Sequence, residues 1–392
     1  MKFWKEHLIF SSILLFFLAC NNSPKPTLYA SAAPVATIPV PIDSIKIKQG
    51  VLYHRLDTYF TNRARFNTFN GNVLVAKGGR VIYKACFGYC DFGQRDSLDP
   101  ETSFHLASTS KPFTATAILK LVEDGKLKLS DSLRQFFPQM PYKNVTIENL
   151  LSHRSGLPNY LYFGEKLWPD KSVYLTNEEL VNLLQKNKTI EGTTRAGTHF
   201  QYCNTNFALL ASIVEIVSGK KFPDYMYEIF FQPLGMRHTF VRNVEAEKQK
   251  TKTAKSYNSK WVMQKEDPYD GVYGDKNIYS TIEDLLIWDK AFYEQKNISA
   301  ASQKLAATPH SFEHKGHRNY GLGWRLMLQP NGTYLQYHNG WWHGNNTVYY
   351  RYEPDSFALI ILSNKYNRSI YNVQPIFNLI TGTKDTVDYG EE

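Results

Sequence analysis

Residues 72–84 read Asn72-Val-Leu-Val-Ala-Lys77, then Gly78-Gly79, then Arg80-Val-Ile-Tyr-Lys84. Two runs of strand-forming residues on either side of a Gly-Gly pair predict a β-hairpin with a two-residue turn. Strand patterns return near the other end of the chain, over residues 320–328, 333–338, 347–352 and 357–362. Strands at both chain ends predict an antiparallel sheet that is assembled from the two ends.

Helix signals dominate between these strands, from about residue 108 to 295. Residues 110–124 end at Gly125, residues 204–217 end just before Gly219, and Thr176-x-x-Glu179 is a capping box that opens another helix. We therefore expect an α+β fold, in which the sheet is flanked by helices. A mainly helical lobe, about residues 125–270, is inserted, and a cleft lies at the junction.

The first 20 residues predict an export signal. Lys2 and Lys5 precede an apolar run that ends at Cys20 and is shorter than the roughly 20 residues needed to span a bilayer. A Cys directly after Leu18-Ala19 resembles a bacterial lipobox, which predicts lipidation of Cys20 and a membrane-anchored lipoprotein of the cell envelope, facing the periplasm or the outside. Plain signal-peptidase cleavage stays open, because Phe17 and Leu18 depart from the commonest pattern.

The next segment predicts a tether. Residues 21–44 hold five prolines among small and polar residues, a composition that cannot bury enough apolar surface to fold. The expected domains are thus a signal peptide at 1–20, a Pro-rich tether at 21–44 and a folded domain at 45–392.

The excess of positive charge does not indicate a nucleic-acid-binding protein. The chain of 392 residues has 45 Lys and Arg against 36 Asp and Glu. The densest basic stretch, from Lys248 to Lys265, lacks helical or strand period, so we interpret it as a solvated loop and expect no nucleic-acid partner. His310, His314 and His317 lie in another polar loop, and we expect no metal or other cofactor.

The cysteines after Cys20 are expected to be free thiols. Cys86 and Cys90 lie in one strand-like segment, where a rise of ~3.3 Å per residue places their Cα atoms ~13 Å apart. A disulfide needs a separation below about 7 Å. We extend the expectation of a free thiol to Cys203.

Ser108-Thr-Ser-Lys111 is the strongest candidate for chemistry. It lies where a strand-like Phe104-His105-Leu106 meets a helix, so that side chains i and i+3 share one face. A serine hydroxyl needs an adjacent base to act as a nucleophile, and a helix N-terminus stabilises an oxyanion. The second Ser-x-x-Lys, Ser218 to Lys221, lies at a helix C-terminus, where the dipole opposes an oxyanion. Spacing alone leaves an N-cap serine as an equal alternative for Ser108.

Two further motifs could complete a site. Tyr202-Cys-Asn204 precedes an apolar helix; its Tyr hydroxyl could carry a proton near Lys111, and its amide could hold Lys111 and a substrate carbonyl. His338-Asn-Gly340 ends a strand-like run, where the glycine would let a substrate backbone approach. With 26 tyrosines, a Tyr-x-Asn motif also arises by chance, as in Tyr142-Lys-Asn144.

Taken together, these motifs resemble the serine β-lactamase and penicillin-binding protein superfamily, in its class C-like branch with esterases, D-aminopeptidases and DD-peptidases. The similarity runs in order through the stretches 104–115, 150–158 (Leu-Leu-Ser-His-Arg-Ser-Gly-Leu-Pro), 202–204, 233–236 (Pro-Leu-Gly-Met), 320–324 (Tyr-Gly-Leu-Gly-Trp) and 338–340. The resemblance implies a DD-peptidase/β-lactamase-like catalytic domain at 45–392. It also implies an acyl-enzyme on Ser108, with Lys111 and Tyr202 sharing proton transfer. Asn204, His338 and Gly340 would bind substrate, and the N–H groups of Ser108 and Trp341 would hold the oxyanion.

Departures from the family pattern bear on the substrate. Cys203 and Asn339 replace smaller or hydroxyl side chains, and Trp341-Trp342 would narrow the cleft or stack on a substrate. His338 stands where class C β-lactamases carry Lys, and an imidazole would gain charge, and attract a substrate carboxylate, only as the pH falls towards 6. We therefore favour a peptidase or esterase acting on D-amino-acid peptides or small esters. A β-lactamase is the first alternative, and a non-catalytic binding or scaffold protein that keeps the fold is the second.

Overall fold

The computed structural model describes residues 50–187, 190–244, 251–313, 316–329 and 332–381. These residues fall within one compact unit. The expected signal peptide, Cys20 and tether lie outside the described residues, so the domain limits stay predictions. Among the described residues, no helix has the length and apolar character needed to cross a membrane.

A seven-stranded antiparallel sheet joins the two ends of the described chain, as predicted. Its strand order is β2-β1-β12-β11-β10-β9-β8, so the early hairpin pairs directly with the last strand. The strands are β1 (Gly71–Lys77), β2 (Arg80–Phe87), β8 (Arg318–Tyr320), β9 (Arg325–Leu328), β10 (Tyr334–Trp342), β11 (Asn345–Tyr352) and β12 (Phe357–Ser363). The hairpin turn has positive φ at both Gly78 and Gly79, which is the conformation that a two-residue turn of the mirror-image type requires.

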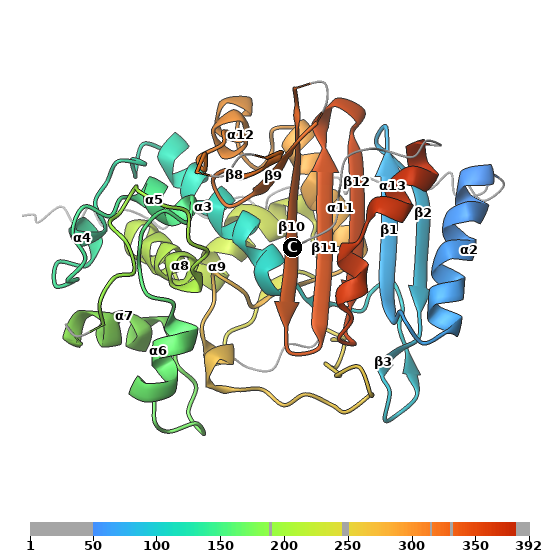
Figure 1. Ribbon diagram of the computed structural model, residues 1–392, viewed down its shortest axis with the longest axis horizontal. Coiled ribbons are helices and arrows are strands. Elements are labelled where there is room, and N and C mark those ends of the chain that lie inside the picture. The colour runs from blue at the N-terminus through green and yellow to red at the C-terminus, as the bar shows by residue number, and fades with distance from the viewer. Residues whose placement is uncertain (1–49, 188–189, 245–250, 314–315, 330–331, 382–392) are drawn as a thin grey trace, which may run out of the picture. The chain divides into compact units, whose positions relative to one another are not determined.

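Helices cover both faces of this sheet (Figure 1). On one face, α2 (Val51–Arg65) and α13 (Gln374–Thr381) bury a core around Phe60, Tyr350 and Leu359. On the other face lie α11 (Ile282–Tyr293), α3 (Lys111–Glu123) and α8 (Asn204–Ser218), around a larger core that contains Phe113, Phe207 and Trp288. The fold class is therefore the α+β arrangement that the sequence predicts.

The remaining elements lie mostly between α3 and β10. The helices are α4 (Leu133–Phe136), α5 (Ile147–Leu151), α6 (Tyr160–Leu167), α7 (Asn177–Lys186), α9 (Phe222–Met226), η2 (Tyr227–Phe231), α10 (Gln232–Leu234), η3 (Pro268–Gly271) and α12 (Ala300–Ala306). Short strands are β3 (Tyr89–Asp91), β4 (Asp96–Ser97), β5 (Phe104–His105), β6 (Phe240–Val241) and β7 (Ile278–Ser280). Three further short helical turns are η1 (Ala107–Ser110), between β5 and α3, η4 (Glu353–Asp355), between β11 and β12, and η5 (Arg368–Tyr371), between β12 and α13.

Local signals behave as the sequence predicts. The side chain of Thr176 accepts from the backbone N–H of Glu179, and Glu179 reaches back to the N–H of Thr176, which completes the capping box of α7. α8 ends at Gly219 in the left-handed conformation. Cys86, Cys90 and Cys203 are free thiols, as expected.

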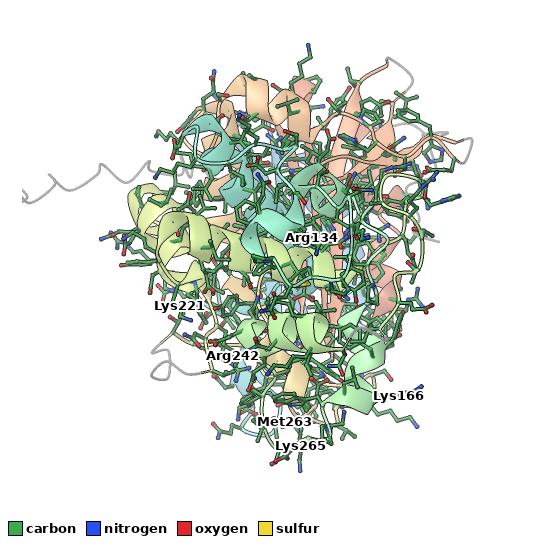
Figure 2. All side chains as sticks on the ribbon, turned by 90° about the vertical axis from the view of Figure 1, so that its left-hand side faces the viewer. Arg134, Lys166, Lys221, Arg242, Met263 and Lys265 are labelled. Carbon is green, nitrogen blue, oxygen red and sulfur yellow. The ribbon has the colours of Figure 1, made fainter. Side chains whose placement is uncertain are left out.

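Two lysines of the basic stretch form ion pairs with the β3–β4 region. The Lys252 ammonium lies 3.0 Å from Asp96 and 2.9 Å from Asp99, and Lys255 pairs with Asp91 at 2.6 Å. These two lysines therefore tie their segment to the β3–β4 region, whereas Lys260 and Lys265 are exposed, as expected of a solvated loop. Figure 2 shows Arg134, Lys166, Lys221 and Lys265 spread over separate segments of one face rather than along one element.

Candidate active site

Ser108 is presented by a short strained turn between β5 and α3. Ala107 has φ 51°, a conformation that costs energy for a residue with a side chain. Its backbone N–H donates to Nδ1 of His105 at 2.9 Å, and Nε2 of His105 donates to Oδ1 of Asn277 at 2.8 Å. Burial lowers the pKa of His105 to about 4, so this support is neutral at pH 7. Ala107 and its neighbours are buried, whereas Ser108 is half-buried, so the turn presents the serine towards solvent.

Lys111 makes three short hydrogen bonds with its ammonium nitrogen. Nζ lies 3.0 Å from Oγ of Ser108, 2.9 Å from Oδ1 of Asn204 and 2.9 Å from the carbonyl oxygen of Asp275. A charged ammonium can donate all three bonds. A neutral amine has two N–H donors for the Asn204 and Asp275 oxygens, and its lone pair can then accept from the Ser108 hydroxyl. The same geometry therefore suits both protonation states of a base.

Tyr202 lies beside this pair. Nζ of Lys111 is 4.9 Å from the Tyr202 ring centroid, and the guanidinium of Arg325 is 5.5 Å from it. The ring of His153 packs against the Tyr202 ring at a centroid distance of 4.3 Å. Within the described residues, Tyr202 makes these contacts through its ring, and the half-buried side chain borders the Ser108 region. The structure thus brings together Ser108, Lys111, Tyr202 and Asn204.

The stretch 150–158 holds the Tyr202–Asn204 segment in place. Nδ1 of His153 accepts from the backbone N–H of Cys203 and from the Asn206 amide, both at 3.2 Å. Ser155 donates to Oδ1 of Asn206 at 2.6 Å. Burial, with the charges of Lys111 and Arg325 adding to it, lowers the pKa of His153 well below its usual range. His153 therefore stays neutral, a supporting role that the sequence motif alone did not reveal.

His338 is completely buried on β10. Its Nδ1 donates to the carbonyl of Asn339 at 2.8 Å, which leaves Nε2 to accept from the Tyr320 hydroxyl at 3.3 Å. Burial lowers the pKa of His338 well below its usual range, and the nearby charges of Arg325 and Lys111 add to this effect. The expectation that His338 gains charge as the pH falls towards 6 is therefore wrong. Burial of an imidazole is a tertiary effect that the motif could not show.

Gly340 allows β10 to pack directly on the Ser108 turn. A Cβ atom at Gly340 would lie 2.3 Å from the carbonyl oxygen of Leu106 and 2.4 Å from Oγ1 of Thr347. Thr347 donates to the same Leu106 carbonyl at 2.7 Å, and Thr109 donates to the carbonyl of His338 at 3.2 Å. The glycine is thus required by the protein's own backbone, whereas we expected it to admit a substrate. This packing places Trp341 on the strand beside the turn that carries Ser108.

Residues 274–277 form a second wall that the sequence analysis missed. Besides its carbonyl bond to Lys111, Asp275 accepts at Oδ2 from the Tyr160 hydroxyl at 3.0 Å. The buried Lys276 ammonium lies 3.6 Å from the same carboxylate oxygen and also donates to the Tyr160 hydroxyl. The adjacent charges Asp275 and Lys276, which follow Asp267 and Asp270 in a run rich in tyrosine and glycine, were the available signal.

A nearby cluster has metal-ligating side chains but fits an ion-pair network. Asp267, Asp270 and His343 have ligand atoms within 4.8 Å of one another. Asp270 already accepts from the Trp342 indole at 2.7 Å, from His343 at 2.9 Å and from the N–H of Asp267 at 2.7 Å. Burial lowers the pKa of the adjacent Lys276, while Asp275, Asp270 and Asp267 favour its charged form. Cationic side chains therefore compensate these carboxylates.

The competing motif is remote from this site. Ser218 is half-buried at the C-terminal end of α8, where its hydroxyl interacts with the backbone of Lys220. Asn204 begins the same helix, and 14 residues at about 1.5 Å each separate the two by roughly 21 Å. His314 lies outside the described residues.

Comparison with known proteins agrees with this geometry. Residues 63–374 match the Beta-lactamase family. A penicillin-binding protein of Bacillus subtilis (strain 168) is 33% identical over 83% of this chain and 74% of its own length. A D-aminopeptidase of Brucella anthropi is 25% identical over 69% of this chain and 51% of its length. The structure of an octameric penicillin-binding protein homologue from Pyrococcus abyssi superposes with a TM-score of 0.72 and 26% identity, over 84% of this chain and 77% of that chain. The chain therefore belongs to the Beta-lactamase family and is a serine hydrolase.

Proposed function

We propose that this serine hydrolase is a cell-envelope peptidase or esterase that forms an acyl-enzyme on Ser108 and acts on D-amino-acid peptides or small esters. The observation that carries the proposal is the 3.0 Å contact between Nζ of Lys111 and Oγ of Ser108, with Asn204 and the Asp275 carbonyl filling the remaining positions around the amine. A serine paired with such a base is the arrangement that acyl transfer needs.

The reaction would proceed in two steps. Oγ of Ser108 attacks the substrate carbonyl while its proton passes to the Lys111–Tyr202 pair, and the N–H groups of Ser108 and Trp341 hold the oxyanion. The pair returns the proton to the leaving amine or alcohol as the carbonyl–heteroatom bond breaks. Water then attacks the acyl-enzyme and releases the acid and free Ser108. We assign proton transfer to the pair jointly, because Lys111 contacts Ser108 and lies against the Tyr202 ring.

Asn204 and Arg325 would orient the substrate. Because Oδ1 of Asn204 accepts from Lys111, the NH₂ group of the same amide is left to donate to a substrate carbonyl. The Arg325 guanidinium beside Tyr202 supplies a permanent positive charge, which the buried His338 does not. A substrate carboxylate would therefore bind to Arg325 rather than to His338.

Peptidase or esterase activity is favoured over β-lactamase activity by the neutral His338 at the position where class C β-lactamases carry Lys, and by the similarity to a D-aminopeptidase. The test is a panel of D- and L-alanyl p-nitroanilides, p-nitrophenyl acetate and a chromogenic β-lactam, compared by kcat/KM. We expect turnover of the ester and a preference for the D- over the L-anilide. A β-lactam turned over with the highest kcat/KM would support the β-lactamase alternative, and no turnover with no adduct on Ser108 would support the scaffold alternative.

Envelope anchoring is a separate proposal that rests on the sequence of residues 1–44. Expressed in a bacterium that lipidates proteins, the full chain should incorporate a labelled fatty acid and partition into detergent, and Cys20→Ala should abolish both. A mature protein that retains Met1 and is recovered from the cytosol would contradict export.

A further inference from the structure

Trp342 occupies the catalytic face of β10. Side chains alternate along a strand, so Trp342 shares a face with Gly340 and His338. Gly340 on that face packs against the Leu106 carbonyl, immediately before the Ser108 turn. Trp342 follows Gly340 by two residues, or about 7 Å along the strand, and its indole is half-buried.

The indole is held in one orientation by two buried charged side chains. Its Nε1 donates to Oδ1 of Asp270 at 2.7 Å, and the Lys276 ammonium lies 4.7 Å from the ring centroid. The side chains of Asp270 and Lys276 are each 3% exposed. Lys276 directly follows Asp275, whose carbonyl binds Lys111. Trp342 therefore bridges the two walls of the site, β10 and the 274–277 segment.

Trp341 behaves differently. It is 58% exposed and points to the opposite face of β10, where its ring makes a tilted contact with the Tyr366 ring at a centroid distance of 5.7 Å. The sequence suggested that the two tryptophans either narrow the cleft or stack on a substrate. Of the two residues, Trp342 is the candidate for narrowing the cleft, whereas Trp341 is open to solvent.

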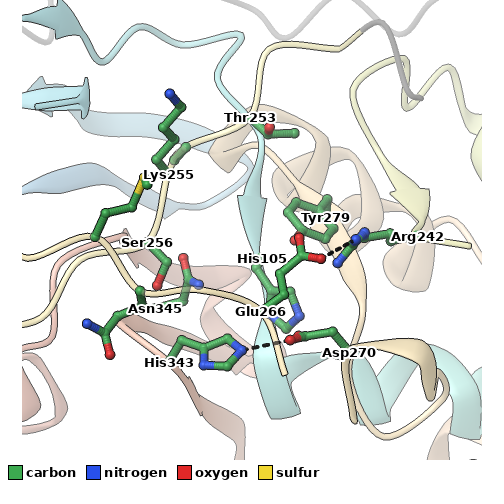
Figure 3. Close-up of a pocket in the computed structure, with 13 residues that line it drawn as sticks. His105, Arg242, Thr253, Lys255, Ser256, Glu266, Asp270, Tyr279, His343 and Asn345 are labelled. Carbon is green, nitrogen blue, oxygen red and sulfur yellow. Dashed lines mark hydrogen bonds and ion pairs between the residues drawn. The ribbon is translucent and has the colours of Figure 1, made fainter. Parts of the chain in front are cut away.

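A cavity lies next to Asp270 and His343, and neither Trp342 nor Ser108 is among the residues that line it. Its volume is about 250 Å³, and Asp270, His343, His105, Ser256 and Arg242 are among its lining residues. Figure 3 shows the Asp270–His343 ion pair at its edge and the Arg242–Glu266 pair across from it. One carboxylate oxygen of Asp270 thus accepts the hydrogen bond from the indole, and the other pairs with His343. Asp270 and His343 both line the cavity.

We propose that Trp342 is a specificity-determining residue that closes the acyl end of the cleft, so that the acyl group transferred to Ser108 is small, of acetyl or alanyl size. Removal of the indole would leave room at this position of β10 for a larger acyl group. This inference rests on the proposed function, because it assumes that Ser108 is acylated, and it narrows the substrate class of that site.

The test compares two esters that share one leaving group, p-nitrophenyl acetate and p-nitrophenyl phenylacetate. The measured quantity is the ratio of kcat/KM for phenylacetate to that for acetate. Trp342→Ala should raise this ratio at least tenfold, and Trp342→Phe, which keeps most of the bulk, should leave it within about twofold of the wild-type value. Trp342→Leu provides an intermediate variant if Trp342→Ala does not fold.

Trp261→Ala is a matched control. The Trp261 indole is also half-buried, donates one Nε1 hydrogen bond, to Asn67 at 3.2 Å, and has a lysine ammonium 4.8 Å from its ring. The phenylacetate-to-acetate ratio of kcat/KM in the Trp261→Ala variant should equal that of the wild type. A flat ratio in folded Trp342→Ala and Trp342→Leu, or an equal rise in Trp261→Ala, would overturn the inference while leaving acylation of Ser108 intact. A wild-type protein that turns over neither ester and takes no label on Ser108 would instead refute the proposed function.

Discussion

At the residue scale, the site is organised around the number of hydrogen bonds that Lys111 can make. Three acceptors surround one nitrogen, and two of them, Asn204 and the Asp275 carbonyl, are fixed by separate segments of the chain. When the amine is neutral, those two acceptors occupy its N–H groups and direct its lone pair to Ser108. The surrounding histidines, His153 and His338, have lowered pKa values and add no charge near neutral pH.

Arg325 provides a prediction at this scale. Arg325→Gln should raise KM about fivefold for a substrate with a free carboxylate, because a charge pair near a protein surface contributes on the order of 1 kcal/mol. A neutral ester should keep its kcat and KM. Arg134→Gln, on the exposed helix α4 (Figure 2), serves as the control and should change neither substrate. Equal effects of Arg325→Gln on both substrates would show that Arg325 does not recognise the carboxylate.

At the element scale, the contact between η1 and β10 fixes the geometry of the nucleophile. Gly340→Ala would place a methyl carbon 2.3 Å from the backbone oxygen of Leu106, so the turn or the strand must shift. Overpacking of this kind costs about 1–3 kcal/mol, and we expect a lower melting temperature together with a loss of kcat/KM of at least a hundredfold. Gly316→Ala, where a Cβ has open space, is the matched control. A Gly340→Ala protein with wild-type activity would contradict the role of this contact.

The turn between β10 and β11 carries a pH-dependent ion pair. Burial would lower the pKa of His343, but the hydrogen bond and charge of Asp270 outweigh burial and raise it. Burial would likewise raise the pKa of Asp270, yet its bonds to His343 lower it to about 2. The contribution of His343 to the free energy of unfolding is complete below its unfolded-state pKa of about 6.5. It is lost as the pH rises through the raised pKa of the folded state. The Asp270 contribution is complete above about 3.8 and is lost as the pH falls towards 2.

His343→Asn tests this pair, because Asn tolerates the positive φ of 52° at this position and does not titrate in the range. The melting temperature of the variant should lie furthest below that of the wild type at pH 5–6, by the equivalent of about 1 kcal/mol, and the difference should shrink by pH 9. Asp267 and Lys276 face the same pair; burial raises the pKa of Asp267 and lowers the pKa of Lys276. A difference that is constant from pH 5 to 9 would show that the imidazolium is not stabilised by Asp270.

At the scale of the whole molecule, local patterns predicted what local physics controls. Two adjacent glycines predicted the hairpin turn, and the Thr176–Glu179 box predicted the start of α7, because both depend on residues within four positions. Strand patterns at both ends predicted that β1 would join the sheet of β10–β12. The supporting residues could not be found in this way. The bond from Lys111 to the Asp275 carbonyl links positions 164 residues apart, and the lowered pKa of His338 depends on its burial and on the charges of Arg325 and Lys111.

Acylation of Ser108 is the claim on which the rest depends, and one measurement tests it directly. The purified protein is treated with a fluorophosphonate, its intact mass is measured, and the adduct is located by peptide mapping. We expect one adduct per chain, on Ser108, and none on a folded Ser108→Ala protein, because Ser108 combines a half-buried hydroxyl with the Lys111 amine at 3.0 Å. An adduct on Ser218, or a folded wild-type protein that takes no label, would contradict the claim.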